Sequence, residues 1–294
     1  MSAAGPPQGA NRSPSRGSAG AELNNSSASV GVHKLALLSA SGITKRFGGV
    51  QALSEVSFTI NHGEIYGLIG PNGAGKTSLF NVLTGIYAAD GGTFMFDGEP
   101  LEHMKPNDVA ARGIARTFQN IRLFANLSAL ENVMIGRHVR TRAGVWGAIS
   151  RNARTRAEEH AIHQRSFELL KYVGVDKRAH SLARHLAYGD QRRLEIARAM
   201  ATEPKLLALD EPAAGMNATE TASLRALLED IRRDGTTILL IEHDMKLVMS
   251  LCDRVLVLDY GKKIAEGPAA EVQKDERVIA AYLGGEVSIN LKGT

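Results

Sequence analysis

Apolar residues in the first and last thirds of the chain gather in short segments that predict β-strands. The expected strands are residues 35–43, 56–60, 64–69, 91–96, 206–211, 237–241, 254–258 and 262–266. Segments of about five residues bounded by Gly, Asn or Asp are typical of strands buried in a sheet. Helices are expected between them, over 76–83, 191–201 and 219–234, with a last helix ending near 283. This alternation predicts an α/β fold.

Two turns predict which strands pair directly. The Asn61-His62-Gly63 sequence separates strands 56–60 and 64–69 and predicts an antiparallel hairpin there. A second hairpin is expected near the end of the chain, between 254–258 and 262–266.

The character of the sequence changes from strand to helix near Arg116-Thr117-Phe118-Gln119. Residues 129–135 and 155–173 have helical spacing, with Ile162, Leu169, Leu170 and Val173 on one side. Between these helices lies the apolar segment 144–149, which holds the only Trp, Trp146. Two interpretations stay open: an anchor against a partner, or a seal for the helix pair.

Composition places the ends of the chain outside the folded domain. Residues 1–33 are rich in Ser, Ala, Gly, Asn and Pro without apolar periodicity, so we expect a disordered tail. The tail lacks the apolar region of a signal peptide. One domain is expected over 34–284, with a helical subdomain inserted at about 120–188, and residues 285–294 form a short C-terminal tail.

Charge and cysteine content narrow the function classes. The 294 residues carry a net charge of +4 and no apolar run of about 18 residues, so any membrane role is peripheral. The single Cys252 makes no disulfide framework, fits a reducing cytoplasm and is expected to be buried. Residues 137–184 hold eleven basic and four acidic side chains, a net +7. That segment fits nucleic acid, anionic lipid or an acidic partner loop, or is a solvated helical surface.

A glycine-rich segment directly after strand 64–69 predicts a phosphate-binding loop. It comprises Gly70, Pro71, Asn72, Gly73, Ala74, Gly75, Lys76, Thr77 and Ser78. Glycines let successive backbone N–H groups surround an oligophosphate, and the following helix directs its positive end at the same charge. Lys76 can reach the terminal phosphates, and the hydroxyl of Thr77 can bind Mg²⁺.

Further candidate residues follow strands of the same expected sheet. Ligands gather at the carboxyl ends of parallel strands, where Asp210, Glu211 and His243 are placed. Asp210 is a ligand for Mg²⁺, Glu211 can orient and deprotonate the attacking water, and His243 can bond the γ-phosphate. Phe47 precedes the loop and either stacks on adenine or closes the small β-layer.

These motifs, taken in order, resemble the ATP-binding subunit of an ABC transporter. They are 70–77, Gln119, Leu186–Arg193, Leu209–Pro212 and Glu242–Asp244, and the resemblance covers about residues 36–284. It implies a P-loop NTPase core of ABC type with an antiparallel β-subdomain and an inserted helical subdomain. It implies that Phe47 stacks on adenine, that Glu211 is the catalytic base and that His243 is the switch histidine. Gln119 would be the coupling glutamine and a Mg²⁺ ligand.

The resemblance also implies an assembly. Two ATP-binding chains, either two copies or this chain with a paralogue, would form a head-to-tail dimer. In it, Ala187, Gly189 and Asp190 of one subunit would contact the ATP held by the other. The inserted helices would receive a cytoplasmic helix of one of two transmembrane permease subunits, which places the protein at the cytoplasmic face of the bacterial inner membrane.

More narrowly, residues 188–198, 213–217 and the insertion 136–184 resemble the ATPase of branched-chain amino acid importers. Such importers also use a periplasmic substrate-binding protein. Three alternatives remain: an importer of urea or short amides, a soluble ABC ATPase acting on nucleic acid or ribosomes, and a regulatory subunit with little turnover. A single ATPase core and the absence of coiled-coil heptads oppose the second, so no nucleic-acid partner is expected.

Three positions depart from the general family pattern. Ala187 replaces the usual serine, Asp190 the glutamine, and Asn217 the commoner aspartate. Losing the serine hydroxyl removes a hydrogen bond to a charged group, worth roughly 1.5 to 3 kcal/mol. Asp190 would repel phosphates if it lay near them, so we expect it to face ribose or solvent.

Overall fold

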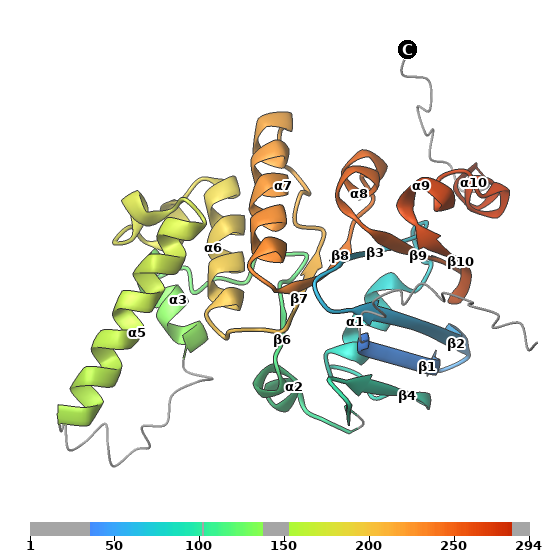
Figure 1. The fold of residues 1–294 in the computed structure, drawn as a ribbon, viewed down its shortest axis with the longest axis horizontal. Helices are drawn as coiled ribbons and strands as arrows, with labels where there is room; N and C mark the ends of the chain where they lie inside the picture. The colour runs from blue at the N-terminus through green and yellow to red at the C-terminus, as the bar shows by residue number, and fades with distance from the viewer. Residues whose placement is uncertain (1–35, 102, 138–152, 284–294) are drawn as a thin grey trace, which may run out of the picture. The chain divides into compact units, whose positions relative to one another are not determined.

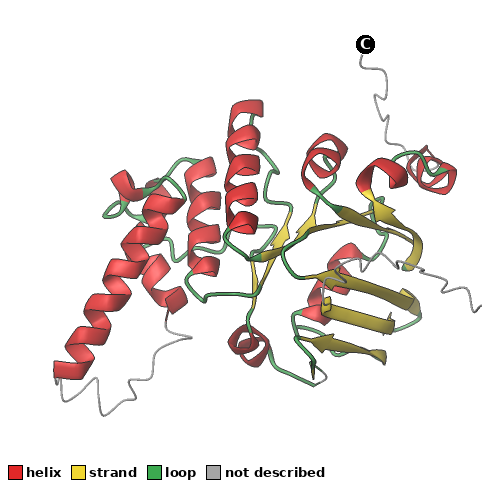
Figure 2. Cartoon of the chain, in the orientation of Figure 1, coloured by secondary structure: helices red, strands yellow, loops and turns green. Residues whose placement is uncertain are grey.

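The computed structural model describes residues 36–101, 103–137 and 153–283, which two β-sheets organise (Figures 1 and 2). The segments 1–33, 144–149 and 285–294, on which expectations were stated above, lie outside the described residues. The strands are β1 (Ala36–Phe47), β2 (Val50–Asn61), β3 (Ile65–Ile69), β4 (Gly91–Phe96), β5 (Glu99–Pro100), β6 (Ile114–Arg116), β7 (Leu206–Asp210), β8 (Thr237–Ile241), β9 (Arg254–Asp259) and β10 (Lys262–Pro268). The helices are α1 (Lys76–Leu83), α2 (Pro106–Arg112), α3 (Ala129–Arg137), α5 (Ala153–Tyr172), α6 (Tyr188–Met200), α7 (Ala218–Arg233), α8 (Met245–Leu251), α9 (Ala269–Val272) and α10 (Glu276–Leu283).

The larger sheet has the strand order β10-β9-β3-β8-β7-β6 in the described part of the chain. Neighbouring strands from β9 to β6 are parallel, and β10 pairs antiparallel with β9 as expected. Every residue of β3, β7 and β8 is buried because alternate side chains enter two different cores. In β7, Leu207 and Leu209 pack in the core that includes α6 and α7, while Leu206 and Ala208 pack in the core that includes α1.

The smaller sheet is antiparallel, with the order β2-β1-β4-β5, and it corrects one prediction. The expected hairpin at Asn61-His62-Gly63 is wrong. β2 pairs with β1 around the Gly48-Gly49 turn, where Phe47 lies opposite Val50, and β3 joins the larger sheet between β8 and β9. β3 is buried throughout whereas β2 alternates between buried and exposed positions, so only β3 fits a sheet that is covered on both faces.

The helical part of the chain is built by α3, α5 and α6, which pack together on the left of Figure 1. Leu169, Leu170 and Val173 are buried and Ile162 is half-buried, as their spacing predicted. The Asn132 side chain is fully buried and holds the loop before α3, donating to the backbone of Phe124 at 3.1 Å and accepting from it at 2.9 Å.

Several elements agree with the expected boundaries, and others were not anticipated. α1 and β8 have the expected bounds, β7 ends one residue earlier than expected, and Cys252 is buried. The helix expected over 191–201 begins at Tyr188 instead, so its first turn includes residues 188–190. α2, β6 and α8 are short elements that the apolar pattern did not reveal.

Candidate functional site

The phosphate-binding loop leaves the carboxyl end of β3 and runs into α1, as its sequence predicts. Gly70 and Gly75 have φ angles of 148° and 103°, which side chains rarely adopt. A Cβ on Gly70 would collide with the carbonyl oxygen of Leu258, and one on Gly75 would lie 2.6 Å from that of Ala52. These glycines therefore let the loop lie directly against the neighbouring backbone. Asn72, Gly73 and Thr77 are exposed on it.

Lys76 lies at the centre of this loop. Its side chain is buried, and Nζ donates to the carbonyl oxygens of Gly70 at 2.6 Å and Pro71 at 3.0 Å. Burial lowers the pKa of the ammonium, while the carboxylates of Glu211 and Asp210 oppose that shift. The structure thus brings the loop and the two acids within electrostatic reach of each other, as the sequence predicted.

Glu211 lies between two further predicted residues. Gln119 Nε2 donates to Glu211 Oε2 at 2.9 Å, and His243 Nδ1 lies 3.3 Å from Glu211 Oε1. These residues come from three segments: the one after β6, the end of β7 and the end of β8. Glu211 has a φ of 48°, a left-handed conformation that is uncommon for a side chain of this size and that often marks a functional site. A carboxylate in such a position is chemically able to accept a proton from a water molecule.

Asp210 is buried one residue earlier, at the last position of β7. Burial raises the pKa of its carboxyl, and the neighbouring Arg116 opposes the shift. The oxygens of Asp210, Thr77 and Gln119 are the hard donors that Mg²⁺ prefers.

Glu242 is a buried carboxylate to which the sequence assigned no separate role. Its Oε1 accepts from the backbone N–H of Ala213 at 2.8 Å, and its Oε2 from that of His243 at 3.3 Å. Burial raises the pKa of Glu242, and these N–H groups oppose that shift. Glu242 therefore ties the loop after β7 to His243. An acid directly after a buried strand was the available signal.

Phe47 lies at the end of β1, where its ring meets Tyr87 edge-on with centroids 5.1 Å apart. Phe47 remains 41% exposed, and the ammonium of Lys45 lies 5.4 Å from its ring centroid. Both interpretations of Phe47 stay compatible with this position, because one edge of the contact is made with Tyr87 and much of the ring is open to a ligand.

The segment Ala187, Gly189 and Asp190 begins α6. Ala187 is the N-cap without a side-chain hydrogen bond, Gly189 packs against the Glu220 side chain, and Asp190 is half-buried in the first turn. In the described part of the chain, no hydrogen bond or ion pair joins these three residues to the phosphate loop of the same chain. Backbone N–H groups at this helix start can bind an anion from another molecule.

Two buried charged residues of α6 were missed by the sequence analysis. Arg192 is 3% exposed and Glu195 is 1% exposed, and they lie 3.5 Å apart. Both bond to the backbone around Gln119. Their spacing of three residues on a helix indicates an ion pair, but the pattern alone does not show that the pair is buried.

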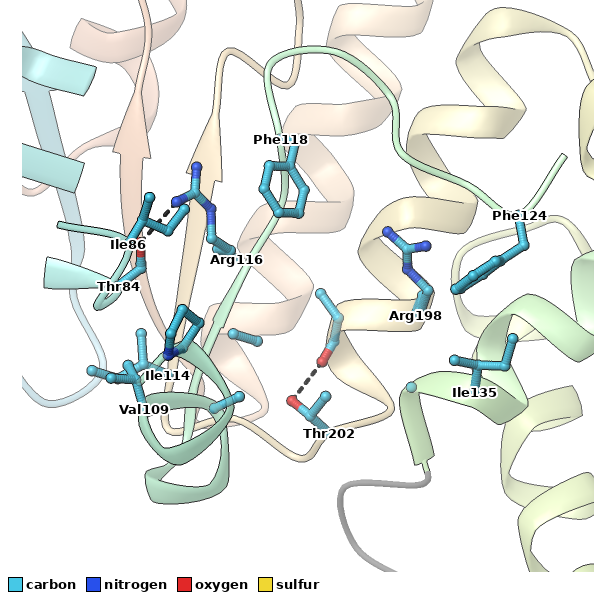
Figure 3. A pocket seen from close by; sticks show the side chains of 15 residues that line it. Thr84, Ile86, Val109, Ile114, Arg116, Phe118, Phe124, Ile135, Arg198 and Thr202 are labelled. Atoms are coloured by element: carbon cyan, nitrogen blue, oxygen red, sulfur yellow. Dashed lines mark hydrogen bonds between the residues drawn. The ribbon is translucent and has the colours of Figure 1, made fainter. Parts of the chain in front are cut away.

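A groove of about 310 Å³ separates α2 and β6 from α3 and the end of α6 (Figure 3). Apolar side chains such as Ile86, Ile135 and Phe124 line it together with two arginines. Arg116 lies 4.5 Å from the ring centroid of Phe118, and Arg198 lies 5.9 Å from that of Phe124. Phe124 is 49% exposed. The groove is therefore apolar with cationic walls.

Comparisons with known proteins agree with this geometry. The family model described as ABC transporter matches residues 53–214, and the model described as branched-chain amino acid ATP-binding cassette transporter matches 262–288. The high-affinity branched-chain amino acid transport ATP-binding protein LivG of Salmonella typhimurium is 45% identical, over 84% of this chain and 98% of its own length. BraF of Pseudomonas aeruginosa, described in the same words, is 42% identical over the same shares.

Solved structures support the same relationship. A crystal structure of a nucleotide-free ATP-binding cassette from an ABC transporter superposes with a TM-score of 0.74 at 30% identity, covering 84% of this chain and 99% of that one.

Within the described residues, no helix is long and apolar enough to cross a membrane.

Proposed function

The chain belongs to the ABC transporter family of ATP-binding proteins, and from this premise we propose that its ATP hydrolysis powers uptake of branched-chain amino acids. Nucleotide binding, ATP hydrolysis coupled to transport and association with membrane permeases follow from the family. The observation that supports a hydrolytic rather than a regulatory subunit is Glu211, held between Gln119 and His243. The cargo is proposed from the relatives named above; they do not favour urea, short amides or nucleic acid.

We assign the site residues as follows. The phosphate loop 70–78 binds the phosphates of ATP, and Phe47 stacks on adenine. Thr77, Asp210 and Gln119 hold Mg²⁺, which when bound neutralises charge on the phosphates. Glu211 takes the proton of the attacking water, and His243 orients that water against the γ-phosphate. The domain organisation stated from the sequence, one ABC domain over 34–284 with helices inserted at about 120–188, is part of the proposal.

The assembly is proposed as two ATP-binding chains, identical or paralogous, with two transmembrane permeases on the cytoplasmic face of the membrane and a periplasmic binding protein outside. In the head-to-tail dimer, Ala187, Gly189 and Asp190 meet the ATP of the partner chain. A permease helix enters the groove beside Phe124. Because most of the side chains that line the groove are apolar, that helix is expected to present apolar side chains to it.

Purification of the tagged full chain from mildly solubilised cells tests these partners. We expect two polytopic membrane proteins and a second ATP-binding chain to co-purify. Phe124→Glu is expected to abolish recovery of the permeases, because a carboxylate replaces an aromatic contact in the groove. Phe167→Glu is the matched control, since Phe167 is 41% exposed on α5, close to the value for Phe124, but does not line the groove. Recovery with ribosomes or nucleic acid instead would overturn the transport proposal.

Uptake tests the cargo. In cells lacking the gene, the wild-type chain is expected to restore uptake of labelled leucine, and unlabelled isoleucine and valine are expected to compete with it. Competition by urea without any by these amino acids would replace the proposed cargo and leave the ATPase assignment intact.

Asp190→Asn tests how the start of α6 faces the partner's ATP. A carboxylate about 4 Å from phosphate would cost roughly 4 kcal/mol at an effective dielectric of 20. Since we expect Asp190 to face ribose or solvent, ATP-driven dimerisation, measured by light scattering, should stay unchanged in the variant. Dimerisation several-fold tighter than wild type would place Asp190 against the phosphates.

A further inference from the structure

Arg192 is a buried cation on α6 that binds the backbone of the segment directly after β6. Its guanidinium donates to the carbonyl oxygen of Phe118 at 2.9 Å and to that of Gln119 at 2.5 Å. It also donates to the Tyr188 hydroxyl at 2.9 Å, and its carboxylate partner Glu195 lies 3.5 Å away. A planar guanidinium can hold two carbonyl oxygens in a defined geometry, which an ammonium cannot do.

Glu195 binds the same segment, the turn 118–122, by accepting hydrogen bonds from backbone N–H groups of that turn. Its Oε1 accepts from the backbone N–H of Phe118 and of Arg122, both at 3.4 Å. The ion pair thus binds carbonyl oxygens through its cation and N–H groups through its anion. More than seventy residues separate the two segments in sequence, so this clamp sets where the turn 118–122 lies relative to α6.

The side chain of the clamped residue reaches the hydrolytic site. Gln119 Nε2 donates to Glu211 at 2.9 Å while its own carbonyl oxygen accepts from Arg192. A continuous series of polar contacts therefore runs from the first turns of α6 through the backbone of Gln119 to Glu211. Gln119 is exposed, so no surrounding core holds its side chain, and the position of its backbone sets whether its amide can reach that carboxylate.

We propose that Arg192 is a positioning residue that sets Gln119 against Glu211 and thereby links the start of α6 to hydrolysis within the same chain. This inference rests on the proposed roles of Gln119 and Glu211. In the proposed dimer α6 faces the partner's ATP, so the link would carry the state of one nucleotide site to the other. Arg192 itself touches neither ATP nor the attacking water.

The test is a double-mutant cycle on the full-length purified chain. Arg192→Gln is expected to lower kcat about 10- to 100-fold, the effect of losing charge-assisted hydrogen bonds on a transition state. KM and the Kd for ATP should change little, because the phosphate loop is untouched. Arg192→Lys should restore part of kcat. In the Gln119→Ala background, Arg192→Gln should have almost no further effect on kcat, because its effect passes through Gln119.

Arg193→Gln is the matched control. Arg193 is the next residue of α6, but it donates to the carbonyl oxygen of Val173 at 3.1 Å and to Ser223, away from the clamped turn. It should leave kcat essentially unchanged, and the thermal stability of both variants is measured alongside so that kcat is compared among folded chains only. Additive effects of Arg192→Gln and Gln119→Ala, or an equal loss of kcat in Arg193→Gln, would overturn the proposal.

The turnover of Glu211→Gln tests the proposed function separately from the role of Arg192. If Glu211→Gln retained normal turnover, the role of Glu211 itself would be withdrawn. If Glu211→Gln is inactive but the cycle is additive, only the positioning role of Arg192 is overturned.

Discussion

Lys76→Ala is expected to abolish ATP binding. The ammonium lies inside the phosphate loop, bonded to the carbonyl oxygens of Gly70 and Pro71. On binding, it exchanges these neutral acceptors for phosphate oxygens, and hydrogen bonds to charged groups are worth about 1.5 to 3 kcal/mol each. Two such bonds correspond to a Kd weaker by at least about 100-fold. Titration calorimetry with ATP in the presence of Mg²⁺ measures this.

The loss should be specific to the loop. Lys205→Ala removes an exposed lysine that pairs with Asp97 outside the site, and its Kd should equal that of wild type. A Lys76→Ala chain that binds ATP normally would show that the loop backbone and the positive end of α1 are sufficient, and Lys76 would lose its assigned role.

Glu211→Gln is expected to bind ATP normally and to hydrolyse it about 10²- to 10⁴-fold more slowly, the usual contribution of a general base. The amide has almost the shape of the carboxylate, so contacts to Gln119 and His243 can persist, but it cannot accept a proton at neutral pH. ATP then stays between the two chains, and the dimer should accumulate. Light scattering with ATP and Mg²⁺ follows the dimer, and phosphate release follows turnover.

Glu229→Gln serves as its control, because Glu229 is a surface carboxylate of α7 paired only with Arg225 in the described residues. Glu229→Gln should hydrolyse ATP at the wild-type rate, and its ATP-bound dimer should dissociate after hydrolysis and not accumulate. A Glu211→Gln variant with normal phosphate release would remove Glu211 as the base and point to another group at the end of β7 or β8.

Local spacing was enough to predict the phosphate loop and the strands that flank the site. The helix α1 that follows the loop and the strand β8 were predicted with their observed bounds, and β7 ends one residue before its predicted end. Each depends on neighbours in sequence: glycines where the backbone must turn toward a phosphate, and about five apolar residues where both faces of a strand are buried. Asp210, Glu211 and His243 then follow, because strand ends of a parallel sheet lie on one edge.

Pairing between distant segments could not be predicted in the same way. The Asn61-His62-Gly63 turn has the same composition whether the chain forms a hairpin or crosses to another sheet. The chain crosses to the larger sheet because β3 is buried on both faces. The same holds for Arg192. A cation next to another arginine on an amphipathic helix is typical of a surface, yet the turn at Phe118 and Gln119 covers it. The sequence by itself thus determined the local chemistry of the site, because spacing is a property of neighbouring residues. Only the tertiary structure decided which backbone each buried charge binds, because that depends on how segments far apart in sequence pack together.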